Sequence, residues 1–97
     1  MVTTLLRVLV EGTGEAVAGV LHEEVRFRQG DGTVHRGRAA VLTMFERSEH
    51  GTRHHVVGEA FDTVRVAVEV PGMPGAFSFL LCGRAEGRQL VEVWVEP

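Results

Sequence analysis

Residues 53–70 read RHHVVGEAFDTVRVAVEV, two strand-like runs separated by Asp62-Thr63. β-Branched residues and alternating polarity are typical of half-buried strands, and the short connection predicts a tight turn. Two more runs of this kind follow, entered through Pro71-Gly72-Met73-Pro74-Gly75 and joined to each other by Glu86-Gly87. Because short connections imply antiparallel neighbours, we predict a meander. Its strands are predicted at Arg53–Phe61, Val64–Val70, Ala76–Ala85 and Arg88–Glu96.

The first half of the chain predicts helices and one hairpin. Leu5, Leu6 and Leu9 recur at helical spacing before Gly12, and glycine commonly follows the end of a helix. Alternating residues on both sides of Gly30-Asp31-Gly32 indicate a hairpin. The predicted elements are a helix ending at Gly12, a short helix ending near His22-Glu23-Glu24, strands at Val25–Gln29 and Thr33–Arg36, and a helix from Arg38 to about Ser48. This order predicts an α+β fold with the helices on one face of a curved antiparallel sheet.

Length and composition bound the class of protein. The chain has 97 residues, so we expect a single domain over residues 1–97. Hydrophobic residues make up 44% and charged residues 24%, which excludes intrinsic disorder. The net charge of -3 and the absence of any apolar run of roughly 20 residues argue against nucleic-acid and membrane partners. The single cysteine, Cys82, excludes an internal disulfide and suits a reducing, cytoplasmic location.

The side chains present restrict the chemistry. The sequence contains no lysine and no tyrosine, so a Schiff base and a phenolic donor are excluded. Five histidines are present, but His54 and His55 point to opposite faces of a strand, while His22 and His50 are expected at helix ends. Since three ligands are not expected to converge, we predict neither a metal site nor a cofactor. The arginines alternate with glutamates along the chain, which is typical of a solvated face.

Five stretches, taken in order, resemble the nuclear transport factor 2-like superfamily, which includes SnoaL-like polyketide cyclases, ketosteroid isomerases and scytalone dehydratase. They are LVEG at 9–12, VLHEEVRF at 20–27, HRGRAAV at 35–41, RHHVVG at 53–58 and EGRQLV at 86–91. The resemblance covers nearly the whole chain. It implies a cone in which about three helices pack on the concave face of the sheet and enclose an apolar pocket. Catalysts, binders and assembly modules all share this fold.

The register of the second hairpin decides which of its side chains face that pocket. A two-residue turn at Asp62-Thr63 places His55, Val57 and Glu59 on the pocket face, together with Val66 and Val68. Asp-Thr lacks the glycine that such turns prefer. A register shifted by one residue therefore remains an alternative, and it would place His54 instead of His55 on the pocket face of this histidine doublet.

The other two hairpins supply the remaining pocket residues. A three-residue loop at Gly30-Asp31-Gly32 pairs Phe27 with His35 and turns the imidazole inward, whereas a two-residue loop would turn it outward. A turn at Glu86-Gly87, read with the resemblance, makes the face of Ser78, Leu80, Cys82 and Val93 concave. The predicted ligand-binding residues are Phe27, Gln29, Met44, Phe45, Val57, Glu59, Val66, Val68, Ser78, Leu80, Cys82 and Val93.

The resemblance also bears on chemistry. His55 falls on the position of the active-site histidine in the strand of scytalone dehydratase that RHHVVG resembles. The ketosteroid isomerase positions for a tyrosine and two aspartates hold Leu5, Gln29 and Leu80, so that enzyme's base and oxyanion donors are not retained. We predict a pocket for a small apolar or aromatic molecule, with His55 and His35 as catalytic acid-base groups for isomerisation, cyclisation or dehydration.

Two alternatives stay open beside this prediction. His55 can instead be a core histidine whose ring nitrogens bond to Glu59, Gln29 or backbone. The domain can also be a non-catalytic dimeric assembly or ligand-sensing module. A homodimer through the convex face is expected, with Phe77, Phe79 and Trp94 at the contact, unless the end of the chain covers these residues.

Overall fold

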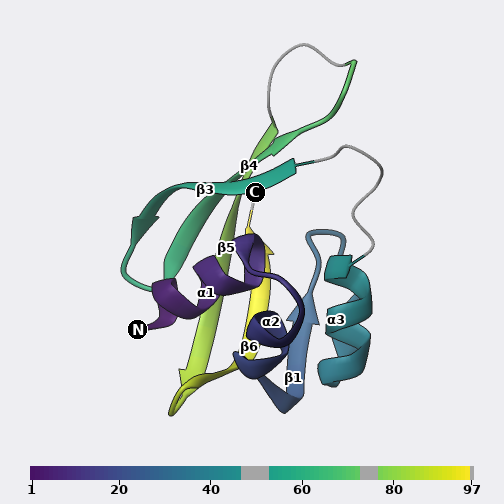
Figure 1. Ribbon diagram of the computed structural model, residues 1–97, viewed down its shortest axis with the longest axis vertical. Helices are drawn as coiled ribbons and strands as arrows, with labels where there is room; N and C mark the ends of the chain where they lie inside the picture. The colour runs from purple at the N-terminus through teal and green to yellow at the C-terminus, as the bar shows by residue number, and fades with distance from the viewer. Residues whose placement is uncertain (47–52, 73–76, 97) are drawn as a thin grey trace.

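The computed structural model describes residues 1–46, 53–72 and 77–96, so the predicted positions of Ser48, His50 and Ala76 lie outside the described residues. Figure 1 shows helices on one side of a curved sheet. The elements are α1 (Val2–Glu11), α2 (Gly14–Gly19), β1 (Leu21–Arg28), β2 (Val34–Arg36), α3 (Arg38–Glu46), β3 (Arg53–Ala60), β4 (Thr63–Glu69), β5 (Phe77–Glu86) and β6 (Gln89–Glu96). The predicted α+β class is confirmed.

The sheet has six strands in the order β2-β1-β6-β5-β4-β3. The predicted antiparallel meander is confirmed for β3 to β6, and β1 joins it by pairing in parallel with β6. This pairing also makes β1 begin at Leu21 rather than at the predicted Val25. Leu21 pairs with Leu90, whose backbone N–H donates to Val20 O at 2.7 Å. His22 to Glu24 therefore belong to the strand and not to the second helix.

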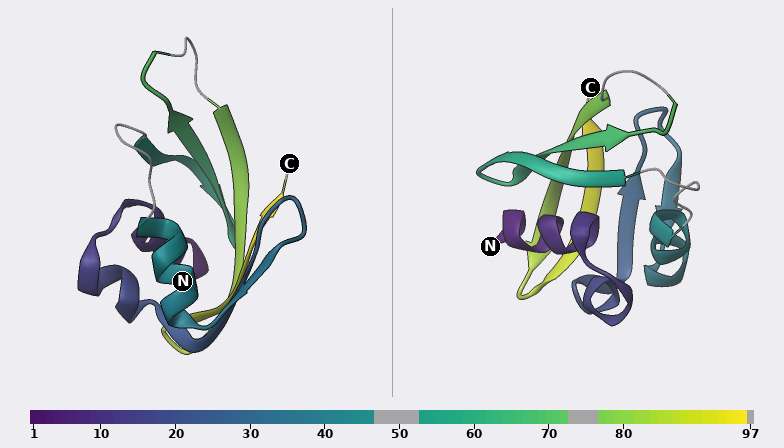
Figure 2. Two further views of the ribbon diagram at one scale, coloured as in Figure 1. Left: turned by 90° about the vertical axis from the view of Figure 1, so that its right-hand side faces the viewer. Right: turned by 45° about the horizontal axis from the view of Figure 1, so that its top comes forward.

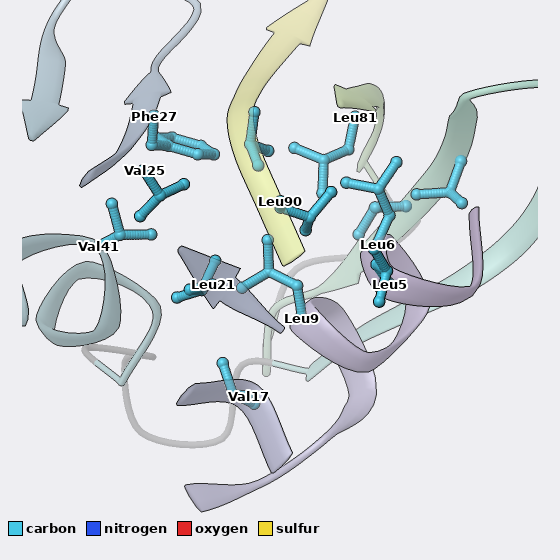
Figure 3. Close-up of a cluster of buried hydrophobic side chains, with 13 residues drawn as sticks. Leu5, Leu6, Leu9, Val17, Leu21, Val25, Phe27, Val41, Leu81 and Leu90 are labelled. Atoms are coloured by element: carbon cyan, nitrogen blue, oxygen red, sulfur yellow. The ribbon is translucent and has the colours of Figure 1, made fainter. Parts of the chain in front are cut away.

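The core lies between the helices and the concave face of the sheet (Figure 3). Leu5, Leu6 and Leu9 recur every three or four residues, so α1 buries one apolar face against the sheet. Leu6 is fully buried and approaches Gly83 of β5. A Cβ at Gly83 would lie 3.0 Å from Leu6 Cδ2, so the missing side chain lets α1 pack closely. Figure 2 shows all three helices on this one face.

Two β-bulges decide which side chains face the helices. In β3, Val56 pairs with Val66 but Gly58 pairs with Arg65, so Val57 is an extra residue. In β6, Glu92 pairs with Arg84 but Leu90 pairs with Ala85, and the extra residue is Val91 on β6. An extra residue reverses the facing of every side chain beyond it, because strand side chains alternate with a period of two.

The predicted registers of both C-terminal hairpins are wrong. The turns are Phe61-Asp62 and Gly87-Arg88, not the predicted Asp62-Thr63 and Glu86-Gly87, because Ala60 pairs with Thr63 and Glu86 pairs with Gln89. The predicted facing of the side chains is wrong only beyond the bulges. In the β3–β4 hairpin, His54 and not His55 shares the concave face with Val66 and Val68. In the β5–β6 hairpin, Phe79 and Leu81 share it with Val93 and Val95. Three residues that were predicted to be concave lie on the convex face instead: Ser78, Leu80 and Cys82.

Because of the same reversal, the three residues of the predicted dimer contact do not lie on one face of the sheet. Phe77 and Phe79 alternate on β5 with convex residues and so belong to the concave side, whereas Trp94 lies on the convex side beside Cys82. The grouping of these three side chains on one face is wrong.

Within the ranges described, no helix is long and apolar enough to cross a membrane.

Candidate functional site

A cavity of about 660 Å³ lies between the concave face of the sheet and the helices. The end of α1, the α1–α2 connection, β1, α3 and the concave side of β3 to β6 all contribute to it. Most of the lining is apolar, and its polar side chains are Thr13, Gln29 and His54. No charged side chain of the described residues lines it. A partly enclosed, apolar cavity with a few polar groups is the common form of a small-molecule site.

Five predicted ligand-binding residues line this cavity: Phe27, Gln29, Met44, Phe45 and Val66. The sequence prediction missed several others, among them His54, Phe79 and Leu81, which the bulges bring to the concave face. Gly58, directly after the extra residue of β3, was a usable signal, because glycine inside a strand often marks a bulge. No comparable signal accompanies Val91.

His54 is the histidine of the doublet that reaches the cavity. It pairs with Val68 on β4 and lines the cavity at a side that is still open, since its side chain remains exposed to solvent. Partial burial nevertheless lowers the pKa of its imidazole below the ordinary value of 6.5. His55 pairs with Ala67, is half-buried and faces the other side of the strand. Of the two, His54 is the one that lines the cavity, and its lowered pKa favours the neutral ring, which can accept a proton there.

Gln29 follows β1 and projects into the cavity from the loop after it. Its backbone N–H donates to Thr33 O at 2.8 Å and closes the three-residue loop at Gly30-Asp31-Gly32. Its amide nitrogen donates to Met44 Sδ at 3.5 Å. Since a thioether is a weak acceptor, the amide loses little by turning to a bound molecule.

The predicted pairing of Phe27 with His35 is confirmed, but His35 is not a lining residue of the cavity. Its ring lies beside that of Phe27, with 6.3 Å between the ring centroids. Phe45 packs edge-on against the same phenylalanine at 5.2 Å. His35 Nε2 is buried and has no hydrogen-bond partner among the described residues. The phenyl ring of Phe27 thus stands beside the imidazole at this end of the cavity.

Glu59, predicted to be a ligand-binding residue, takes part in an ion-pair network outside the cavity. Its carboxylate accepts a hydrogen bond from Arg7 of α1 at 3.0 Å. Arg7 also lies 3.6 Å from Glu11, one turn further along the helix. Glu11 Oε2 in turn accepts the backbone N–H of Val56 at 3.0 Å. The last turn of α1 therefore contacts β3 directly before its bulge.

The other predicted ligand-binding residues are not among the lining residues of the cavity. Val57 is the extra residue of β3 and is 53% exposed. The Ser78 hydroxyl accepts a hydrogen bond from Arg65 on the convex face. Cys82 Sγ is buried 3.4 Å from the Thr63 hydroxyl. The remaining three are not lining residues either: Val68 and Leu80 are half-buried, and Val93 is buried in the core.

In the described part of the chain, no three His, Cys, Asp or Glu side chains come together in a group that could hold a metal ion. The cavity contains one imidazole and no carboxylate or thiol among these residues. The polar groups that the cavity does contain offer hydrogen bonding and, at His54, proton transfer.

Solved structures share this fold over nearly the whole chain, although no family model and no curated protein matches the sequence. A putative ketosteroid isomerase from Kribbella flavida has a TM-score of 0.80 at 16% identity, covering 99% of this chain and 81% of that one. A hypothetical protein with a ketosteroid isomerase-like fold from Catenulispora acidiphila, solved with trimethylamine, has a TM-score of 0.69 at 16% identity, with coverages of 99% and 84%.

A putative polyketide cyclase from Xanthomonas campestris has a TM-score of 0.69 at 19% identity, and the match covers 97% of this chain and 87% of that one. At this level of identity the likeness shows the fold. The expected nuclear transport factor 2-like fold is confirmed, while the activity of the chain has to be argued from its own site.

Proposed function

We propose that the protein binds a small, uncharged, apolar or aromatic molecule in the cavity on the concave face of the sheet. The observation that carries this proposal is the cavity of about 660 Å³, with an apolar lining and no charged side chain among its described lining residues. Moving a charged group into such a place without a partner is costly, so a neutral molecule is favoured. Phe27, Phe45 and Phe79 offer ring surfaces to it.

Two side chains supply the polar contacts. The Gln29 amide offers both a donor and an acceptor, and the neutral imidazole of His54 accepts a proton. In this proposal His54 takes over the acid-base role that the sequence had suggested for His55. The reactions that fit are isomerisation, cyclisation or dehydration with one histidine as the base. Enolisation with a tyrosine and two aspartates is not supported, because Leu5 is a core residue and Leu80 lies on the convex face.

The doublet supplies a matched pair of variants for the test. A thermal-shift screen of neutral apolar and aromatic compounds first identifies a ligand. His54→Ala is then expected to weaken its binding by about tenfold, whereas His55→Ala leaves binding unchanged because His55 faces away from the cavity. Equal loss in both variants, or no compound that shifts the melting temperature, would overturn the proposal.

A second candidate is a dimeric assembly or ligand-sensing module. In its favour, Leu80 and Trp94 lie half-buried on neighbouring strands of the convex face, next to the buried Cys82. We propose this face as the contact of a homodimer in place of the sequence-based grouping. Light scattering at micromolar concentration tests it, since a strictly monomeric mass rules the contact out. A cytoplasmic location also belongs to the proposal and rests on the single, buried cysteine.

A further inference from the structure

A groove on the convex side of β2, β1 and β6 lies apart from the cavity of the proposed function and shares only Trp94 with the dimer contact of the second candidate. Its volume is about 300 Å³. Three guanidinium groups line it, those of Arg26, Arg28 and Arg36, against the single carboxylate of Glu92. This local excess of positive charge occurs in a chain whose net charge is -3. The sequence pattern predicted a solvated face of mixed charge, and the strand register instead brings these arginines together.

Strand pairing explains how the arginines meet. Arg26 on β1 stands directly opposite Arg36 on β2, and Arg28 lies two residues along β1 on the same face. Like charges directly opposite each other in a sheet are destabilising. Such an arrangement becomes favourable when an anion lies between the guanidinium groups, because each can then donate charge-assisted hydrogen bonds.

The one carboxylate in the groove is already occupied. Glu92 Oε1 lies 3.1 Å from Arg26 Nη2 and 2.8 Å from Arg84 Nη2 on β5. Hydrogen bonding from Arg84, together with the charge of Arg26, lowers the pKa of Glu92. Glu92 therefore stays charged and shared between two arginines. Arg28 and Arg36 form no ion pair with any residue in the ranges 1–46, 53–72 and 77–96.

Two apolar side chains flank Arg28, one on each neighbouring strand. Trp94 pairs with Arg28 across β6 and β1 and is half-buried. Its indole N–H donates to Glu96 at 3.1 Å, so its only polar atom is satisfied and the rest of the side chain is hydrocarbon. Val34, opposite Arg28 on β2, is 44% exposed. A flat apolar group can lie against these two side chains.

We propose that this groove binds a small organic anion, a carboxylate or phosphate carried on a flat ring. Arg28 and Arg36 hold the anionic group, since the planar guanidinium matches the oxygen geometry of both kinds of anion. Trp94 and Val34 contact the ring. A groove of about 300 Å³ is at the small end of ligand sites, and its confinement to three strands does not suit the extended backbone of a nucleic acid.

Trp94 is the only tryptophan of the chain, which contains no tyrosine, so its fluorescence reports on this groove alone. We expect phenyl phosphate and benzoate to change the fluorescence saturably at millimolar concentration, with binding weakened by added salt. Phenol, which has the ring without the charge, is expected to produce no saturable change. If benzoate and phenyl phosphate produce no saturable change either, the proposal is overturned.

Two double variants that remove the same charge distinguish binding in this groove from a general attraction of anions to the protein's arginines. Arg28→Gln with Arg36→Gln is expected to weaken phenyl phosphate binding about tenfold. Arg65→Gln with Arg88→Gln removes the same charge outside the groove and is expected to leave binding unchanged. Equal weakening by the two double variants would overturn the site. The site would also be overturned if the double variant of Arg28 and Arg36 changed the oligomeric state of the protein but left phenyl phosphate binding unchanged. The groove would then be a contact between subunits.

Discussion

Glu11→Ala tests how the protein brings His54 to its cavity. Glu11 occupies the last position of α1, where a carboxylate opposes the helix dipole, yet it accepts the backbone N–H of Val56 at 3.0 Å. Val56 directly precedes the extra residue of β3. We therefore expect Glu11 to hold the bulge at Val57, and through it to hold His54 on the concave face.

Glu11→Ala is expected to lower the free energy of unfolding only slightly but to change the facing of His54. A hydrogen bond between a carboxylate and a backbone N–H contributes about 1.5–3 kcal/mol when it is shielded from water. This one is exposed, and removing a carboxylate from a helix C-terminus returns part of the loss, so we expect a net cost of about 1 kcal/mol. Without the acceptor, the bulge can shift along β3, which exchanges the facing of His54 and His55.

Urea unfolding measures the cost, and an NMR titration of the imidazoles measures the facing. In Glu11→Ala, the pKa of His54 is expected to rise toward 6.5, because the ring loses the partial burial that lowers it. Glu11→Gln keeps an acceptor oxygen and is expected to restore the original titration. Glu59→Ala removes the partner of Arg7 but leaves the bond to Val56 intact, so it serves as the control.

The reasoning is refuted if Glu11→Ala leaves the titration of His54 unchanged. It is also refuted if Glu59→Ala changes that titration equally, because the ion pairs rather than the bond to the bulge would then position the strand.

Three further predictions concern stability. Leu6→Ala is expected to lower the free energy of unfolding by about 2–5 kcal/mol in a urea titration, since Leu6 is fully buried between α1 and the sheet. Gly83→Ala places a methyl group 3.0 Å from Leu6 Cδ2 and is expected to lower the free energy of unfolding by about 1–3 kcal/mol in the same urea titration. Phe61 is 98% exposed at φ 56, so Phe61→Gly is expected to raise the melting temperature by relieving the left-handed backbone.

The pH dependence of stability provides one more test, also through His54. Burial lowers its pKa in the folded state, so the unfolded chain takes up the proton first as the pH falls. Stability is therefore expected to decline as the pH drops below about 6.5 and to level off once the folded protein is protonated as well. His54→Gln is expected to remove this decline, and an unchanged decline in the variant would assign it to another group.

The sequence allowed the fold and one hairpin to be predicted, because those signals are local. The loop Gly30-Asp31-Gly32 carries residues that turns favour, and of the two loop lengths that the sequence left open, the structure has the three-residue one, which pairs Phe27 with His35. The other two predicted turns are each displaced by one residue in the structure, and the predicted facing is lost at the extra residues Val57 and Val91. Both hairpins have valines, leucines or other apolar residues on each face, so alternation gives no preference between registers one residue apart. Packing against α1 and the rest of the sheet makes that choice, and the sequence pattern does not display it.

The parallel pairing of β1 with β6 ties the two halves of the chain together at the centre of the sheet. During synthesis on the ribosome, the β1–β2 hairpin has no neighbouring strand until β6 has emerged and docked. The two sides of the cavity come together only when β6 pairs with β1, so the cavity forms in one late step of folding. Long-range pairing of this kind also slows folding relative to a sheet made of hairpins alone.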